Sequence, residues 1–205
     1  MVDNITNIKL NIISLYKSNY LSSYHIREMA KLLEKSHVTL LPHINALEKD
    51  RILNLKKIGK NKICTLNLDN FLVKNYLILA ETNESAIYQK DIFAIKKINT
   101  EISYLNLEGT IVLFGSYAKR TFTKNSDIDL FYLGKISDKE IQEVKNIGKQ
   151  YGKTINIKKS TINYFYDGLR KKDSLIIEII KNHILLQNGE QFINLLWRYY
   201  NEIRI

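Results

Sequence analysis

The stretch Thr110–Leu133 reads Thr-Ile-Val-Leu-Phe-Gly-Ser-Tyr-Ala-Lys-Arg-Thr-Phe-Thr-Lys-Asn-Ser-Asp-Ile-Asp-Leu-Phe-Tyr-Leu, and the rest of the chain is interpreted outward from it. Its continuous apolar run, Ile111 to Phe114, is typical of a strand buried on both faces. Gly115 ends the run and permits a sharp turn with positive φ. Asp127-Ile128-Asp129 then opens a second apolar segment, Leu130 to Leu133. These features predict two strands joined through a glycine turn.

The polar residues of this stretch predict a site for a nucleotide and a divalent ion. Alternate residues of a strand share a face, so the carboxylates of Asp127 and Asp129 point the same way. Two carboxylates on one face, beside a glycine turn, are hard oxygen ligands for Mg²⁺ and a nucleotide's phosphates. Ser116 can offer its hydroxyl and neighbouring backbone N–H groups to a phosphate at a helix N-terminus. Lys119 and Arg120 add positive charge one turn later.

The spacing of these residues is that of a known signature. Gly115-Ser116, ten intervening residues and Asp127-Ile128-Asp129 resemble the motif of the DNA polymerase β nucleotidyltransferase superfamily, especially its small prokaryotic members, the minimal nucleotidyltransferases. The resemblance covers about Ile92 to Ile205. It implies transfer of an NMP from an NTP to a hydroxyl acceptor, with Mg²⁺ or Mn²⁺ as cofactor. The alternative is a solvated Asp-x-Asp turn after an ordinary strand–glycine–helix junction.

The resemblance also implies roles for individual residues and a partner. The catalytic and metal-binding role falls on Asp127 and Asp129. The nucleotide-binding role falls on the residues of the glycine turn: Gly115, Ser116, Lys119 and Arg120. Minimal nucleotidyltransferases often act as antitoxins that nucleotidylate a partner toxin, so a tyrosine or serine hydroxyl of a toxin protein is a candidate acceptor.

The strand expected at Thr154 to Lys158 departs from the superfamily pattern. By resemblance it carries a third carboxylate on the face of the first two, and the best-matching position here is Asn156. An amide is a poorer metal ligand and cannot act as a base, so its presence can cost a few kcal/mol, or about 10² or more in rate. Asp167 is an open candidate for a substitute. The alternative function is therefore a transcription regulator whose degenerate domain only senses nucleotide or holds a partner.

The first 70 residues predict three helices and a basic hairpin. Apolar residues recur at helical spacing, Ser36 is a suitable N-cap for the third helix, and a glycine turn separates two extended runs. The expected helices are Ile8–Tyr16, Ile26–Leu33 and His37 to about Asp50. The expected hairpin comprises Leu53–Ile58, the turn Gly59-Lys60-Asn61 and Lys62–Leu68.

This layout resembles the winged helix-turn-helix domains of prokaryotic, particularly archaeal, transcription regulators. His25 to Ala30 is similar to their second helix, Ser36 to Thr39 to the start of their recognition helix, and Leu47 to Leu53 to the step into the wing. The resemblance implies binding to duplex DNA, with the third helix in the major groove and the wing on phosphates. The implied contact residues are Ser36, His37, Thr39, His43, Lys56, Lys57, Lys60 and Lys62.

Pro42 departs from the pattern of a recognition helix. It removes one helical hydrogen bond and should bend the axis, so we expect the third helix to start later or to be kinked. The alternative for this region is a protein-interaction or dimerisation module whose lysines are merely solvated. Because winged-helix regulators often pair, a homodimer is also expected from the resemblance.

The remaining organisation follows from periodicity. Ser85 to about Leu105 carries one apolar face and predicts a single long helix that joins the two halves. We expect a winged helix-turn-helix at 1–70, a linker and connecting helix at 71–106, and a nucleotidyltransferase domain at 107–205. The fold class is α+β, with a mixed β-sheet flanked by helices in the second domain.

Composition and charge narrow the class of partner. The chain has 205 residues, of which 45% are hydrophobic and 25% charged, as is ordinary for a soluble globular protein. Its formal net charge of +10 favours polyanionic partners, meaning nucleic acid or nucleotides. Residues 1–70 carry 11 Lys and Arg against 6 Asp and Glu, and residues 71–205 carry 20 against 15. The first part is therefore about twice as basic per residue.

Cysteine usage and hydropathy favour a cytoplasmic protein. The lone Cys64 excludes an internal disulfide and a cysteine-rich zinc site, and it fits a reducing compartment. No apolar run approaches the roughly 20 residues that span a bilayer, and no secretion signal is visible. We therefore expect no membrane partner.

Overall fold

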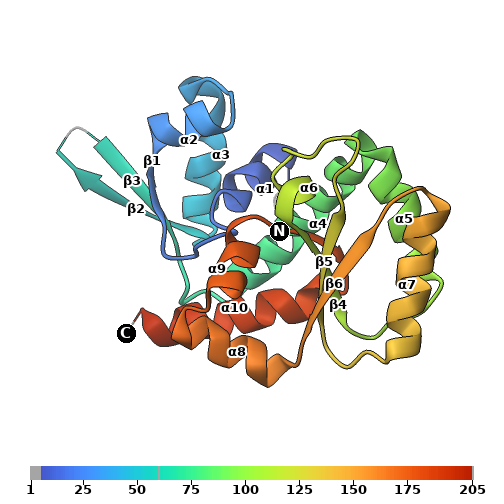
Figure 1. Cartoon of the computed structure of the whole chain (residues 1–205). Coiled ribbons are helices and arrows are strands. Elements are labelled where there is room, and N and C mark those ends of the chain that lie inside the picture. Colours follow the sequence, from blue (N-terminus) through green and yellow to red (C-terminus); the bar gives the residue numbers. More distant parts are fainter. Residues whose placement is uncertain (1–5, 60, 205) are drawn as a thin grey trace. The chain divides into compact units, whose positions relative to one another are not determined.

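The computed structural model describes residues 6–59 and 61–204, and it confirms an α+β fold (Figure 1). The described chain divides into two compact units. The first unit comprises the described residues up to Asn83 together with those from Tyr200 onward, and the second unit is Glu84–Tyr199.

The first unit opens with three helices interleaved with a small β-sheet. Its three strands form an antiparallel sheet in the order β1-β3-β2. The elements in chain order are α1 (Asn7–Ser14), β1 (Ser23–His25), α2 (Ile26–Leu32), α3 (His37–Lys49), β2 (Leu53–Ile58) and β3 (Asn61–Leu66). The short strand β1 does not appear in the sequence-based prediction. It pairs Ser23 with Thr65 and so adds a third strand to the expected hairpin.

The helix α3 begins at His37 despite its internal proline. The Ser36 hydroxyl accepts a hydrogen bond from the backbone N–H of Thr39 at 3.0 Å, which is the expected N-cap. The expected later start is therefore wrong. Pro42 lies inside the helix, where it cannot donate to the carbonyl of Val38. Burial of one face compensates for that loss, since Leu40, Ile44 and Leu47 are all fully buried.

The connecting region contains two helices instead of the single long one expected from Ser85 to Leu105. The helix α4 (Leu72–Asp91) already begins before that range, and α5 (Phe93–Ser103) follows a break at Ile92. Ile92 has φ −118° and ψ 85°, which lie outside the helical region. The expectation failed because apolar periodicity continues through the break. The boundaries expected for the functional domains, after residues 70 and 106, stay predictions.

The second unit is built on a mixed four-stranded sheet in the order β6-β5-β4-β7. The pair β5 and β6 is parallel, while β4 is antiparallel to both β5 and β7. The strands are β4 (Thr110–Phe114), β5 (Ile128–Leu133), β6 (Ile155–Ser160) and β7 (Ile184–Gln187). The remaining helices are α6 (Gly115–Ala118), α7 (Asp138–Gln150), α8 (Ile162–Lys171), α9 (Ser174–Lys181) and α10 (Gly189–Ile203).

Helices cover both faces of this sheet (Figure 1). On one face, Leu113 and Leu130 belong to an apolar cluster with residues of α5 and α7. On the other face, the rings of Phe131 and Phe165 lie 5.7 Å apart, and that of Phe192 follows at 5.4 Å. Because strand residues alternate, Asp129 lies on the same face as Phe131. Among the described helices, none combines the length and the apolar character needed to cross a bilayer.

Candidate active site

The glycine turn predicted at the end of β4 has a conformation and surroundings that require glycine. Gly115 has φ +67°, a region that L-residues rarely occupy. A Cβ at this position would collide with Oδ2 of Asp129. The approach is close because Phe114, the residue before the turn, pairs directly with Asp129 across the β4–β5 ladder. The sequence elements Gly-Ser and Asp-x-Asp thus meet at one point, here called the glycine corner.

Three polar side chains converge beside the glycine corner. Asn156 of β6 lies directly opposite Asp129 in the parallel β5–β6 ladder. Its Nδ2 donates to Oδ2 of Asp127 and to Oδ1 of Asp129, at 3.3 Å each. Asp129 is half-buried, whereas Asp127 and Asn156 are exposed. The position expected to hold a third carboxylate therefore holds an amide that bridges the other two.

This donor set suits a divalent cation on chemical grounds. Carboxylate and amide oxygens are the hard ligands that Mg²⁺ and Mn²⁺ take in proteins. A rotation of the Asn156 amide exchanges its nitrogen for its oxygen, so the same side chain can change from donor to ligand. Among the described residues there is no group of three or more Asp, Glu, His or Cys side chains placed to hold a metal ion. Asp167 of α8, the candidate substitute, therefore does not join Asp127 and Asp129.

The turn around Ser116 is held by a backbone hydrogen bond and by the buried side chain of Tyr88. Ser116 is half-buried, and its backbone carbonyl accepts a hydrogen bond from Thr121 N–H at 3.0 Å. The Tyr88 hydroxyl donates to the carbonyl of Tyr117 at 2.6 Å. Burial raises the pKa of Tyr88 well above its ordinary value of 10, although Arg120 opposes the shift, so the hydroxyl stays protonated. This support fixes the backbone on which a phosphate would rest.

The two basic residues after the turn are each paired with an acid. Lys119 Nζ lies 2.7 Å from Oε1 of Glu178, and Arg120 lies 2.8 Å from Oδ2 of Asp91. The Arg120 guanidinium also lies 4.9 Å from the centre of the Tyr88 ring. Both ion pairs are substantially exposed, so each contributes only about 0–1 kcal/mol. A polyphosphate could compete for either cation at modest cost.

Two further lysines lie near the glycine corner. The sequence analysis did not identify them as candidate site residues. Lys153 donates to the carbonyl of Lys124 at 2.7 Å, which ties the start of β6 to the loop before Asp127. Lys158 is exposed and follows Asn156 by two residues on β6, so it lies on the same face. The period-2 rule could have identified Lys158. No local pattern marks Lys153, because its contact is 29 residues away.

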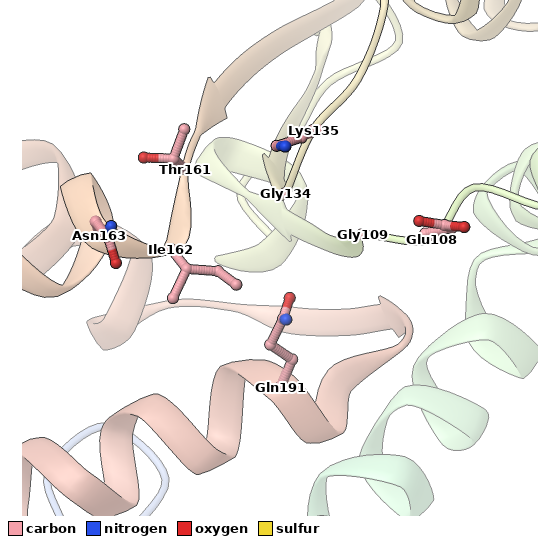
Figure 2. A pocket seen from close by; sticks show the side chains of 8 residues that line it. All are labelled: Glu108, Gly109, Gly134, Lys135, Thr161, Ile162, Asn163 and Gln191. Carbon is pink, nitrogen blue, oxygen red and sulfur yellow. The ribbon is translucent and has the colours of Figure 1, made fainter.

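A separate pocket of about 550 Å³ lies at the opposite end of the sheet (Figure 2). Gly134 follows the end of β5, and Thr161 follows the end of β6, whereas Asp127 and Asn156 lie at the starts of these strands. Figure 2 shows the Gln191 amide of α10 directed toward this space. The pocket lining is Glu108, Gly109, Gly134, Lys135, Thr161, Ile162, Asn163 and Gln191. It contains none of the predicted site residues.

In the first unit, the predicted DNA contacts on α3 differ in their exposure. Ser36, His37 and Thr39 are exposed at the helix start. The hydroxyls of Ser36 and Thr39 also contact each other at 2.7 Å. His43 is half-buried, and its Nδ1 lies 3.4 Å from Oγ1 of Thr6, the N-cap of α1. The structure therefore brings the first three residues to the surface and turns His43 toward the domain interior.

The predicted wing contacts lie on the β2–β3 hairpin. Lys56, Lys57 and Lys62 are exposed, and Lys60 lies outside the described residues. Lys57 and Lys62 are direct partners across the ladder. Like charges placed opposite each other destabilise a strand pair, so this pairing has a cost in the free protein. A bound polyanion would relieve it.

The comparisons with known proteins bear on the second unit. Residues 95–186 match the family model described as a nucleotidyltransferase domain. The matched range runs from within α5 into β7 and contains the glycine corner. This match supports transferase chemistry on nucleotides at a general level. Searches of curated proteins and of solved structures returned no match.

Proposed function

We propose that this protein is a DNA-binding nucleotidyltransferase that moves an NMP from an NTP to a hydroxyl acceptor. The observation that carries the proposal is the convergence of Asp127, Asp129 and Gly115 inside the segment that matches the nucleotidyltransferase domain. In the reaction, the acceptor oxygen forms a bond to the α-phosphorus. The bond between the α-phosphorus and the oxygen that bridges it to the β-phosphorus breaks. Pyrophosphate leaves, and the hydroxyl proton passes to solvent.

Each part of the glycine corner has a role in this proposal. Gly115 and Ser116 bind the β- and γ-phosphates through backbone N–H groups and the hydroxyl. Asp127 and Asp129 hold Mg²⁺ or Mn²⁺, and Asn156 keeps the two carboxylates together. A bound divalent ion would polarise the phosphoryl oxygens and neutralise developing charge. Lys119 and Arg120 exchange their acidic partners for phosphate oxygens.

The acceptor and the biological setting rest on the resemblance to minimal nucleotidyltransferases. We propose a tyrosine or serine hydroxyl of a partner toxin protein as the acceptor, so that the protein acts as an antitoxin. The winged helix-turn-helix unit acts in the cytoplasm as a homodimer, where it binds duplex DNA of its own operon and regulates it. The exposed Lys56, Lys57 and Lys62 support a contact with phosphates.

A second function is favoured by one specific observation. The bridging amide of Asn156 removes a charged ligand from the site, which weakens chemistry more than nucleotide binding. The alternative is a transcription regulator whose nucleotidyltransferase domain senses nucleotide or holds a partner without turnover.

One assay distinguishes the two functions. The purified protein is incubated with labelled ATP, GTP, CTP or UTP, with Mg²⁺ or Mn²⁺, and with candidate acceptor proteins. Transfer that is lost by at least about 10²-fold in Asp127→Ala/Asp129→Ala supports the enzyme. Asp167→Ala removes an exposed carboxylate of α8 and serves as the control, which should keep full transfer. Saturable nucleotide binding without transfer would support the sensor.

The DNA contact has its own assay. Affinity for a duplex should fall steeply with added salt, because binding neutralises phosphates and releases counterions. Lys57→Glu/Lys62→Glu should weaken binding strongly, whereas Lys90→Glu, an exposed lysine of α4, should change it little. Duplex affinity that changes neither with salt nor with the wing substitutions would contradict DNA binding through the wing.

A further inference from the structure

Tyr88 is a buried residue of α4 that contacts the turn after β4 from a distant segment. It has 1% of its surface exposed and belongs to the apolar cluster of the second unit. Its hydroxyl donates to the Tyr117 carbonyl at 2.6 Å, across 29 residues of sequence. Tyr117 belongs to the single helical turn α6 (Gly115–Ala118), here called the phosphate turn. A hydrogen bond from the core therefore ends on the turn to which the proposed function assigns phosphates.

The Tyr117 carbonyl does not need the Tyr88 hydroxyl to be paired. It also accepts a hydrogen bond from the backbone N–H of Arg120 at 3.0 Å. A phenylalanine at position 88 would fill the same buried space without a polar atom, whereas a buried tyrosine hydroxyl requires a partner. The hydroxyl thus adds a second, long-range hydrogen bond to a carbonyl that is already satisfied.

The phosphate turn gains support from this long-range contact because local contacts constrain it less. The turn has four residues, and so short a helix is marginal by itself since nucleation is costly. The Tyr117 ring stacks on the Phe122 ring at 4.2 Å, and Thr121 N–H donates to the Ser116 carbonyl. Both contacts join residues five positions apart, so they shape the turn without tying it to α4. The Tyr88 hydrogen bond supplies that tie.

The Tyr88 side chain also orients the cation that follows the turn. The Arg120 guanidinium lies 4.9 Å from the centre of the Tyr88 ring. Its carboxylate partner, Asp91, follows Tyr88 by one turn of α4. Arg120 has φ +56°, which L-residues rarely adopt, so these two contacts hold it in an unusual backbone conformation. Tyr88 therefore contacts both the phosphate turn and the arginine after it.

We propose that Tyr88 is a positioning residue that makes the nucleotide site select triphosphates over monophosphates. It fixes the turn whose Gly115 and Ser116 are assigned to the β- and γ-phosphates, which a nucleoside monophosphate lacks. Because Tyr88 is buried, it acts through this turn and not on the nucleotide itself. This inference rests on the proposed nucleotide site, and it holds for the enzyme and for the sensor alike.

The experiment compares Tyr88→Phe with Tyr132→Phe in the full-length protein. Tyr132 is the matched control because it is also buried, and its hydroxyl accepts a hydrogen bond from Gly109 N–H at 2.8 Å. Gly109 precedes β4, whereas the phosphate turn follows it. Each substitution removes one buried hydroxyl that is bonded to the backbone, so the two melting temperatures should fall by similar amounts.

Calorimetry with Mg²⁺ then measures the affinity of each protein for ATP, GTP, CTP and UTP and for the matching monophosphates. Tyr88→Phe should weaken triphosphate binding by roughly 3- to 10-fold, the equivalent of one hydrogen bond. Its affinity for monophosphates should stay the same. Tyr132→Phe should retain the wild-type affinity for both classes. Mn²⁺ affinity, measured by electron paramagnetic resonance, is a second reference and should be equal in all three proteins.

The outcomes separate this inference from the proposed function. A wild-type protein that binds no nucleotide would overturn the proposed nucleotide site itself. If the wild type binds triphosphates, an unchanged triphosphate affinity in Tyr88→Phe would overturn only the role of Tyr88. A loss that is equally large for monophosphates or for Mn²⁺, or that also occurs in Tyr132→Phe, would do the same, because it would reflect a general loss of structure.

Discussion

The glycine corner and the α3–wing surface differ in how their candidate functional residues are arranged. The α3–wing surface comprises the exposed predicted DNA contacts, which are Ser36, His37, Thr39, Lys56, Lys57 and Lys62. At the corner, Gly115, Asp129 and Asn156 come from three separate segments and meet at contact distance. On the first unit, the candidate residues lie along one helix and one hairpin, and few of them touch each other. The corner should therefore be disrupted even by a substitution that adds a single carbon atom. On the α3–wing surface, each single substitution should lower DNA affinity only partly.

The largest effects should come from the cores that position the two regions. Leu113→Ala and Leu40→Ala each remove a fully buried side chain, one from β4 and one from α3. Each should lower the free energy of unfolding by about 2–5 kcal/mol. The measurement is urea unfolding of the full chain. Leu79→Ala, at a 43% exposed residue of α4, is the control and should cost much less. Equal losses in all three variants would mean that burial does not govern stability here.

The corner itself can be tested with two glycines of similar conformation. Gly115 and Gly152 have φ +67° and +64°, but only Gly115 has a neighbour in the path of a Cβ. Gly152→Ala should cost about 1–2 kcal/mol from the backbone conformation alone. Gly115→Ala should cost a further 1–3 kcal/mol, roughly, because Asp129 must move. The melting temperature and the nucleotide affinity of each variant are measured. Equal values for Gly115→Ala and Gly152→Ala would contradict the close contact between Gly115 and Asp129.

The substitution Asn156→Asp adds a third carboxylate to the glycine corner. Without a divalent ion, three carboxylates would repel one another, so the melting temperature should fall. With Mn²⁺ it should recover, and Mn²⁺ affinity measured by electron paramagnetic resonance should rise by on the order of tenfold. Asn163→Asp adds the same charge in an exposed position at the other end of the sheet and should change neither quantity. An unchanged affinity in Asn156→Asp would exclude the side chain from the metal site.

The smallest effects concern two helix caps, one in each unit. Ser36→Ala should cost about 1 kcal/mol at α3. The Ser137 cap of α7 differs because its hydroxyl and backbone N–H also donate to Glu140, and these hydrogen bonds hold the pKa of that carboxyl below its ordinary value of 4.5.

The stability costs of removing the two caps should therefore depend on pH in different ways. A lowered folded pKa gives stability that is present above pH 4.5 and is lost as pH falls through the folded value. The cost of Ser137→Ala should shrink below pH 4.5, while that of Ser36→Ala stays constant. Urea titrations at pH 7 and pH 3.5 measure both costs. Parallel pH profiles would contradict the role of Glu140.

Much of the fold could be predicted because it follows from local rules. The Ser36 cap, the buried face of α3 and the strand–glycine–strand order each depend on residues that are neighbours in the sequence. The register of Asn156 against Asp129 followed from matching one short strand to a motif. The break at Ile92 was missed because apolar spacing persists across it.

The missed features are long-range contacts. The acids that hold Lys119 and Arg120 come from α9 and α4, 59 and 29 residues away, and no local pattern links them. The three-residue strand β1 is too short for a period to appear, and it forms only because β3 offers a partner. The pocket of Figure 2 arises where three strand ends and two helices meet, which no single segment encodes.

The facing lysines of the hairpin give ionic strength two effects of opposite sign. Lys57 and Lys62 oppose each other across the ladder, so added salt screens their repulsion and should make the isolated hairpin more stable. The same ions compete with any polyanion for those ammonium groups and weaken its binding. Concentrated salt should therefore stabilise this hairpin and, at the same time, weaken the binding of any polyanion to it.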